Sequence, residues 1–152
     1  MKTEPDVFSI DDLERKGRTS WDGVRNYVAR NHMRSMRVGD LVLIYHSNAK
    51  PSGVAGLGRV EREAFADHTA RDPESPYFDP KATEENPRWD MVEISFVEKF
   101  PATLSLAELK GDPALEGMEV VKKGSRLSVH PVTKKHFDRV VKRARALAVS
   151  VA

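Results

Sequence analysis

Residues 19–34, TSWDGVRNYVARNHMR, bring an indole, a phenol and several guanidinium groups together in one short segment. Trp21 offers a flat surface on which a base or another ring can stack, and the arginines can bond to phosphates. A second interpretation places Trp21 in the core and the arginines on a solvated helix face. Asn26 also has two interpretations, because its amide can bond to the edge of a base or can cap a helix locally. The segment is therefore a candidate for binding something flat and negatively charged.

A second polar group follows an apolar run. The sequence LVLIYHS at 41–47 is typical of a buried strand that ends in His46 and Ser47. Such side chains can form the wall of a pocket, and Gly53 and Gly56 would let a ligand approach the backbone closely. The alternative is that backbone groups satisfy His46 and Ser47. The two glycines do not have the spacing of a phosphate-binding loop.

Composition limits the kinds of chemistry. The 152 residues include no cysteine, which excludes disulfides and thiolate metal sites and favours a reducing compartment. The five histidines do not form an HExxH motif or another paired metal-ligand spacing, and no GxSxG motif is present. No apolar run approaches the ~18 residues of a membrane span, and MKTEPDVFSI does not resemble a secretory signal. We expect a monomer in the cytoplasm, able to associate with the nucleoid, without metal, cofactor or catalytic activity.

Charge is distributed unevenly along the chain. The net charge is only +2, which alone does not indicate a nucleic-acid partner. Basic residues cluster at 25–37 and 134–145, whereas acidic residues gather in 61–98. This distribution is compatible with a basic face and an acidic face.

The elements that must position these residues are short and mixed. Hydrophobic periodicity and capping residues predict helices over 9–17, 24–36, 105–111 and 112–117, and from 133 onward. Strands are expected over 41–47, 54–67, 89–100 and 125–132, with a long irregular connection over 68–88. Because strands and helices do not alternate strictly, we expect an α+β fold with a small mixed sheet or barrel.

Six blocks in this order resemble the EVE-domain family of the PUA-like superfamily. They are KTEPDVFSIDDL, WDGVRNYVARN, GDLVLIYHSNAKPSGVAG, DPESPYFDPK, NPRWDMVEISFV and GSRLSVHPV, and they extend over nearly the whole chain. The resemblance implies one EVE domain over 1–152, with a small, strongly bent, mixed β-barrel flanked by short helices. It also implies kinship with YTH domains, which hold a methylated base in an aromatic cage.

The same resemblance implies a reader of modified bases, with modified cytosine in DNA as the expected ligand. The base-binding residues that it implies are Trp21, Asn26, Tyr27, His46, Ser47 and Ser128. Arg25, Arg30 and Arg126 would contact phosphates, and Gly53 and Gly56 would allow close approach. The sequence departs from the family pattern at Val28 and His130, where glutamine is frequent, and at Ile44, where an aromatic residue is frequent.

Three alternatives remain open at this level. PUA relatives bind structured RNA, so an RNA-binding accessory protein is the first alternative. An enzyme acting on a modified base is the second, with Asn26 and His46 activating water. A small-molecule sensor is the third.

Overall fold

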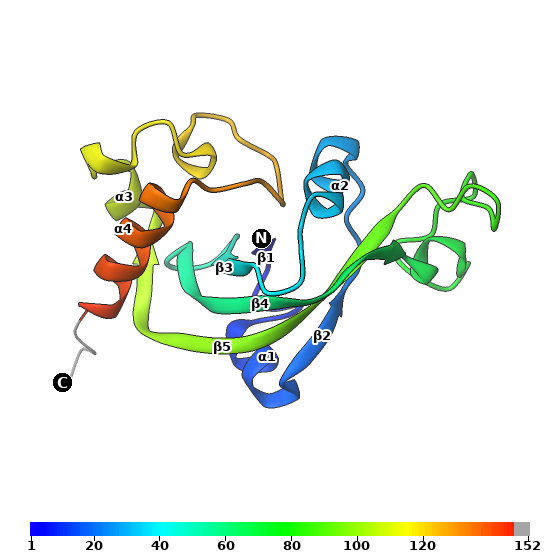
Figure 1. Cartoon of the computed structure of the whole chain (residues 1–152), viewed down its shortest axis with the longest axis horizontal. Coiled ribbons are helices and arrows are strands. Elements are labelled where there is room, and N and C mark those ends of the chain that lie inside the picture. Colours follow the sequence, from blue (N-terminus) through cyan, green and yellow to red (C-terminus); the bar gives the residue numbers. More distant parts are fainter. Residues whose placement is uncertain (148–152) are drawn as a thin grey trace.

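The computed structural model describes residues 1–147, and its centre is a five-stranded mixed sheet with the strand order β1-β3-β4-β5-β2. The strands are β1 (Lys2–Thr3), β2 (Arg18–Trp21), β3 (Leu41–His46), β4 (Gly53–Ala66) and β5 (Asp90–Ser105). β1 runs parallel to β3, and the other neighbours are antiparallel. The α+β expectation is therefore confirmed. The predicted barrel is instead a strongly bent sheet that stays open, with β1 and β2 as its edges (Figure 1).

Short helices lie at both ends of the sheet. The α-helices are α1 (Ile10–Lys16), α2 (Tyr27–Arg34), α3 (Leu106–Lys110) and α4 (Lys134–Arg145). The 3₁₀ helices are η1 (His68–Arg71), η2 (Pro113–Leu115) and η3 (Glu119–Val121). Figure 1 shows α3 and α4 at one end of the sheet and α2 towards the other. Within residues 1–147, no helix is both long and apolar enough to cross a membrane.

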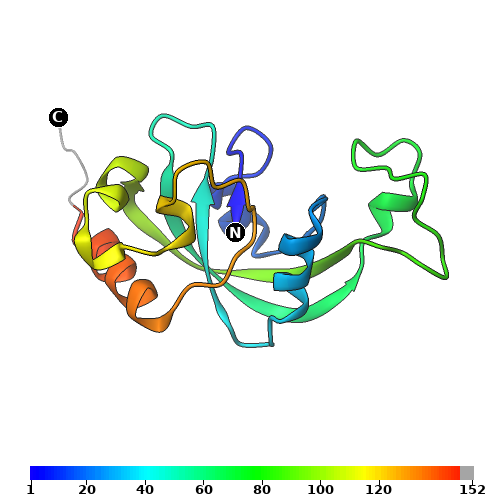
Figure 2. The ribbon, with the colours of Figure 1, turned by 90° about the horizontal axis from the view of Figure 1, so that it is seen from above.

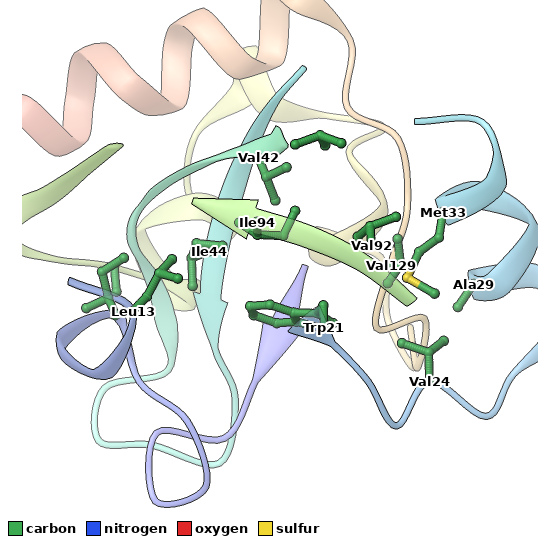
Figure 3. Close-up of a cluster of buried hydrophobic side chains, with 13 residues drawn as sticks. Leu13, Trp21, Val24, Ala29, Met33, Val42, Ile44, Val92, Ile94 and Val129 are labelled. Carbon is green, nitrogen blue, oxygen red and sulfur yellow. The ribbon is translucent and has the colours of Figure 1, made fainter. Parts of the chain in front are cut away.

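Two hydrophobic clusters share the sheet. The first, which we call the α2-side cluster, includes Trp21, Ala29, Met33, Ile44, Ile94 and Val129. The second, the α4-side cluster, includes Leu43, Tyr45, Phe100, Leu109, Val140 and Val141. Successive side chains of a strand point to opposite faces, so β3 places Ile44 in the first cluster and its neighbours in the second. Figure 3 shows Trp21 among the aliphatic side chains of the α2-side cluster.

Glycines in β4 allow this strand to pack tightly against β5. A Cβ atom on Gly53 would lie 2.1 Å from the Leu104 carbonyl oxygen, and one on Gly56 would lie 2.4 Å from the Glu98 carbonyl oxygen. Both glycines are buried. The β5 backbone therefore occupies the space of the missing side chains, which gives these glycines a packing role; close approach by a ligand stays a prediction.

Three local expectations are corrected. Residues 125–132 do not form a strand; one backbone bond, from the Lys2 N–H to the Ser128 oxygen, joins this stretch to β1. The second helix begins at Tyr27 rather than near Val24, because Asn26 is its N-cap. Trp21 is the last residue of strand β2, an element that the sequence did not predict.

The connection between β4 and β5 is irregular, as expected. It contains η1 and several turns, and Figure 2 shows it projecting from the sheet at the end opposite α3 and α4. Side chains at and near the start of α2 form hydrogen bonds with this connection and anchor it to the body of the protein.

Candidate nucleic-acid interface

Three of the predicted base-binding residues gather around the short edge strand β1. Thr3 is paired with His46 in the β1–β3 register. The Ser47 N–H donates to the Thr3 carbonyl oxygen at 2.9 Å, and the Lys2 N–H donates to the Ser128 carbonyl oxygen at 2.8 Å. Segments near residues 3, 46 and 128 therefore meet at one place on the sheet edge. We call His46, Ser47, Ser128 and Thr3 the β1 group.

The His46 ring is held in one tautomer. Its Nε2 accepts the backbone N–H of Ile10, the first residue of α1, at 3.0 Å. In the neutral ring the proton therefore lies on Nδ1, which remains a donor. Burial lowers the pKa of His46, with Asp11 opposing this effect and Lys99 adding to it. At neutral pH the side chain thus presents one N–H and no charge.

Trp21 lies beside this group but belongs to the core. Its side chain is only 8% exposed, and its ring meets Phe8 edge-on, with 6.2 Å between the centroids and an interplanar angle of 85°. The Thr3 hydroxyl donates to the Phe8 carbonyl oxygen at 2.7 Å, which ties Phe8 to β1. Trp21 is therefore connected to the β1 group through Phe8. Its stacking against a base stays a prediction.

The other predicted residues form a second group at the start of α2. The Asn26 side-chain oxygen accepts the Ala29 N–H at 3.0 Å, so Asn26 caps the helix as the local interpretation expected. Tyr27 stacks on Trp89, with 4.6 Å between the ring centroids. The Arg30 guanidinium lies 4.7 Å from the Tyr27 ring centroid and donates to the Arg88 carbonyl oxygen at 2.7 Å. The Arg88 guanidinium in turn donates to the Tyr27 hydroxyl.

Arg25 is used in an internal ion pair. Its Nη1 lies 3.0 Å from an Asp67 carboxylate oxygen, and its Nη2 donates to the Tyr77 carbonyl oxygen at 2.8 Å. Asp67 is 1% exposed and also accepts bonds from Gly23 and Thr69. Burial raises the pKa of Asp67, but the hydrogen bonds from Thr69, Gly23 and Arg25 outweigh it, so the pKa is lowered overall.

These contacts fasten the projecting connection to the helix. We call the set the α2 clamp; its members are Arg25, Tyr27, Arg30, Asp67, Arg88 and Trp89. No hydrogen bond joins the clamp to the β1 group within residues 1–147. The predicted residues therefore belong to two separate hydrogen-bonded groups. Arg126 is exposed and makes no side-chain hydrogen bond to the described residues.

Several participants were not identified from the sequence. Asp67, Arg88 and Trp89 carry the clamp, and Phe8 links Trp21 to β1. The available signal was weak: Trp89 stands just after a proline-rich segment, at the entry of an expected strand. Among residues 1–147, no cluster of three or more His, Asp or Glu side chains is arranged to hold a metal ion.

Comparisons with known proteins identify the family of this chain. The EVE domain model matches residues 1–143. The chain belongs to the EVE-domain family. Human thymocyte nuclear protein 1 is 41% identical to this EVE domain, across 93% of the chain and 71% of the human protein. A crystal structure of a Pseudomonas syringae protein superposes with a TM-score of 0.93 at 47% identity, covering 95% of this chain and 97% of that one.

One similar structure contains a ligand. The human THYN1 protein was solved in complex with DNA that contains 5-methylcytosine. It matches this EVE domain with a TM-score of 0.89 and 40% identity, covering 97% of this chain and 96% of that one.

Proposed function

We propose that this EVE domain is a DNA-binding module that recognises a modified base, with 5-methylcytosine as its first candidate ligand. The observation that carries the proposal is the similarity over nearly the full chain to human THYN1, solved with 5-methylcytosine DNA. An identity of 40% with a TM-score of 0.89 makes a shared binding surface the simplest expectation. We also propose that the chain acts by binding, without catalysing a reaction.

The β1 group supports this proposal because it offers unused polar groups beside aromatic rings. The Nδ1–H of His46 and the hydroxyls of Ser47 and Ser128 form no hydrogen bond with residues 1–147. Flipping a base out of a duplex costs a few kcal/mol, and stacking returns roughly 1–3 kcal/mol. Hydrogen bonds to the edge of the base must therefore supply the remainder, and these three groups are suited to do so.

Contact with phosphates falls mainly to Arg126. Arg25 and Arg30 are already bonded within the clamp, so a phosphate contact would have to compete with Asp67 and with the Arg88 carbonyl group. Arg126 is exposed and makes no such bond within the described residues. We therefore propose Arg126 as the principal phosphate contact of the three predicted arginines.

The test is a fluorescence-anisotropy titration at one fixed salt concentration. Matched DNA duplexes carry cytosine, 5-methylcytosine, 5-hydroxymethylcytosine or N6-methyladenine, and RNA of the same sequence is titrated in parallel. We expect tighter binding to one modified DNA. The His46→Gln variant should lose about tenfold of that preference, because one hydrogen bond to the base is removed.

The matched control is His68→Gln, because His68 is an exposed histidine of η1, away from the β1 group. It should keep the full preference. Equal affinity for all DNA duplexes would overturn base recognition. Tighter binding to RNA, unchanged by base modification, would instead establish the RNA-binding alternative.

A further inference from the structure

A cleft lies on the face of the β1–β3 pair that carries Lys2 and Tyr45, opposite the face of Thr3 and His46, and we propose that it binds a small organic anion with a flat or apolar body. The site is a cleft of about 940 Å³ beside β3, which we call the β3 cleft. Residues from α2, β1, η3 and α4 line it, and Figure 1 shows α2 and α4 on either side of β3. Its volume falls within the range of small-ligand sites, ~300–1,000 Å³. The proposal does not rest on base recognition.

The walls of the cleft are apolar and adaptable. Met36, just after the end of α2, lines the cleft together with Met118, Leu43 and Phe137. Unbranched thioether side chains adjust to ligands of different shape, and a phenyl ring packs well against a flat molecule. Leu41, which also lines the cleft, is 45% exposed and adds apolar surface that a ligand could cover. These surfaces favour a ligand with an apolar or aromatic body.

The cleft contains an ammonium group that has no carboxylate partner among the described residues. The Lys2 ammonium lies 5.8 Å from the centroid of the Tyr45 ring and forms no ion pair with residues 1–147. Burial lowers the pKa of Lys2, and Glu119 partly opposes this effect. Glu119 itself forms bonds to Lys122 and Ser125.

The other ionisable groups that line the cleft differ in their partners. Lys134 is paired with Asp138 at 2.8 Å, and the Met1 amino group donates to the Leu43 carbonyl oxygen at 2.8 Å, with its pKa lowered by burial to about 5. The exposed Asp40 carboxylate accepts only the Arg37 backbone N–H at 2.9 Å, so its charge is not neutralised. Lys2 is therefore the ammonium of the cleft that is free to pair with an anionic group on a ligand.

An imidazole supplies a further polar contact. His130 Nδ1 lies 3.2 Å from the Pro131 carbonyl oxygen, so the neutral ring carries its proton on Nδ1 and leaves Nε2 as an acceptor. Burial lowers the pKa of His130 and favours this neutral form. The ligand that fits has one anionic group for Lys2, a flat or apolar body for the methionines, and a donor for His130. A nucleotide phosphate and an aromatic carboxylate share this chemistry.

The methionines make the test direct. The chain has five, of which Met1, Met36 and Met118 line the cleft, whereas Met33 and Met91 are buried elsewhere. ¹³C-methyl NMR spectra of the full chain are recorded during titration with deoxycytidine 5′-monophosphate, benzoate or uncharged deoxycytidine. We expect saturable shifts at Met36 and Met118 with at least one anion, weaker shifts with deoxycytidine, and little change at Met91.

The anion that shifts the Met36 and Met118 signals shows whether the cleft binds a phosphate or a carboxylate. The proposal is overturned if neither anion shifts Met36 and Met118, or if deoxycytidine binds as tightly as its monophosphate. Equal shifts at Met91 would also overturn it, because they would indicate a general change in the fold.

Variants of Lys2 test the charge. Lys2→Gln should weaken binding of the responding anion by about tenfold or more, and Lys2→Arg should restore most of it. Lys50→Gln, at an exposed lysine in the loop before β4, is the matched control and should bind like the wild type. If Lys2→Gln binds equally well, Lys2 is not the anion contact and the proposal fails. Preference for methylated DNA is measured separately on wild-type protein, so failure of one proposal remains distinguishable from failure of the other.

Discussion

The β1 group and the α2 clamp use similar polar residues for opposite purposes. In the clamp, Tyr27 is stacked on Trp89, and Arg25 is paired with Asp67. In the β1 group, Nδ1 of His46 and the Ser47 hydroxyl have no partner among residues 1–147. The aromatic and arginine residues that the sequence indicated most strongly as ligand contacts therefore bind mainly to other residues of the protein. The less conspicuous polar groups at the end of β3 are the ones available to a ligand.

This difference has a physical cause. A guanidinium group binds carboxylates, carbonyl oxygens and aromatic faces in the same geometry whether these belong to a ligand or to the protein. A long projecting connection brings such partners within reach of α2, so the arginines bind them internally. Residue type alone cannot distinguish the two uses.

The largest expected effect concerns Trp21. Trp21→Ala should lower the free energy of unfolding by about 3–5 kcal/mol, because a large buried ring is removed from the α2-side cluster. Urea unfolding measures this loss, and Trp21→Phe should retain most of the stability. A stability loss below about 1 kcal/mol, with DNA binding abolished, would show that Trp21 serves a ligand more than the core.

The next effect concerns the buried carboxylate of the clamp. Asp67→Asn should lower the free energy of unfolding by about 1.5–3 kcal/mol, because charge-assisted bonds to Arg25, Gly23 and Thr69 are weakened or lost. Asp72→Asn, at an exposed position in the same connection, should be nearly neutral. Both are measured by urea unfolding. If Asp67→Asn folds stably but loses the preference for a modified base, the clamp belongs to the binding site and the comparison fails.

A smaller effect concerns pH. The pKa values of His46 and His130 are lowered in the folded protein, so the unfolded chain binds more protons just below the ordinary value of 6.5. The stability from the neutral rings is fully present above pH 6.5 and is lost as the pH falls towards the folded values. Each ring contributes a slope of at most about 1.36 kcal/mol per pH unit. The free energy of unfolding is measured between pH 5 and 8, in steps on the order of one pH unit. Its dependence on pH should be weaker in His46→Gln and His130→Gln than in the wild type. An unchanged slope in both variants would refute this assignment.

The smallest effect separates the three arginines. Arg126→Gln should reduce the dependence of log K on log salt by about 1, as expected for the loss of one phosphate contact. Arg30→Gln should leave that slope unchanged, because Arg30 is bonded to Arg88 and Tyr27. Anisotropy titrations at several salt concentrations measure both slopes. A reversed result would place the clamp, rather than Arg126, on the DNA backbone.

Local patterns predicted the elements that carry strong local signals. The apolar run at 41–47 and the alternation after residue 89 correspond to β3 and β5, and Thr133 caps α4 as expected. β2 was not predicted, because RTSW is short and mostly polar and is stabilised by pairing with β5, about 75 residues away. The strand expected over 125–132 is absent for the opposite reason: its local pattern resembles a strand, but it lacks a paired partner strand. Its apolar residues pack against the core, but only one backbone bond ties it to β1.

The sequence predicted the part of the candidate site that lies at the end of a single strand, β3. His46 and Ser47 follow an apolar run, so a pocket wall could be inferred there without tertiary information. The pairing of Arg25 with Asp67 joins residues 42 positions apart, and Tyr27 and Trp89 are similarly distant. No spacing rule predicts such contacts, so the sequence could not show that the arginines are internally bound.

The brevity of β1 has a consequence for local opening. This strand has two residues and is held to β3 and to Ser128 by a few backbone bonds, whereas β4 and β5 pair over most of their length. Its amide hydrogens should therefore exchange with solvent long before those of the central strands. Thr3 belongs to the β1 group and Lys2 lines the β3 cleft, so the same short strand contributes to both. A ligand that occupies either side should slow exchange along β1, and exchange at these few amides would report occupancy of both sites.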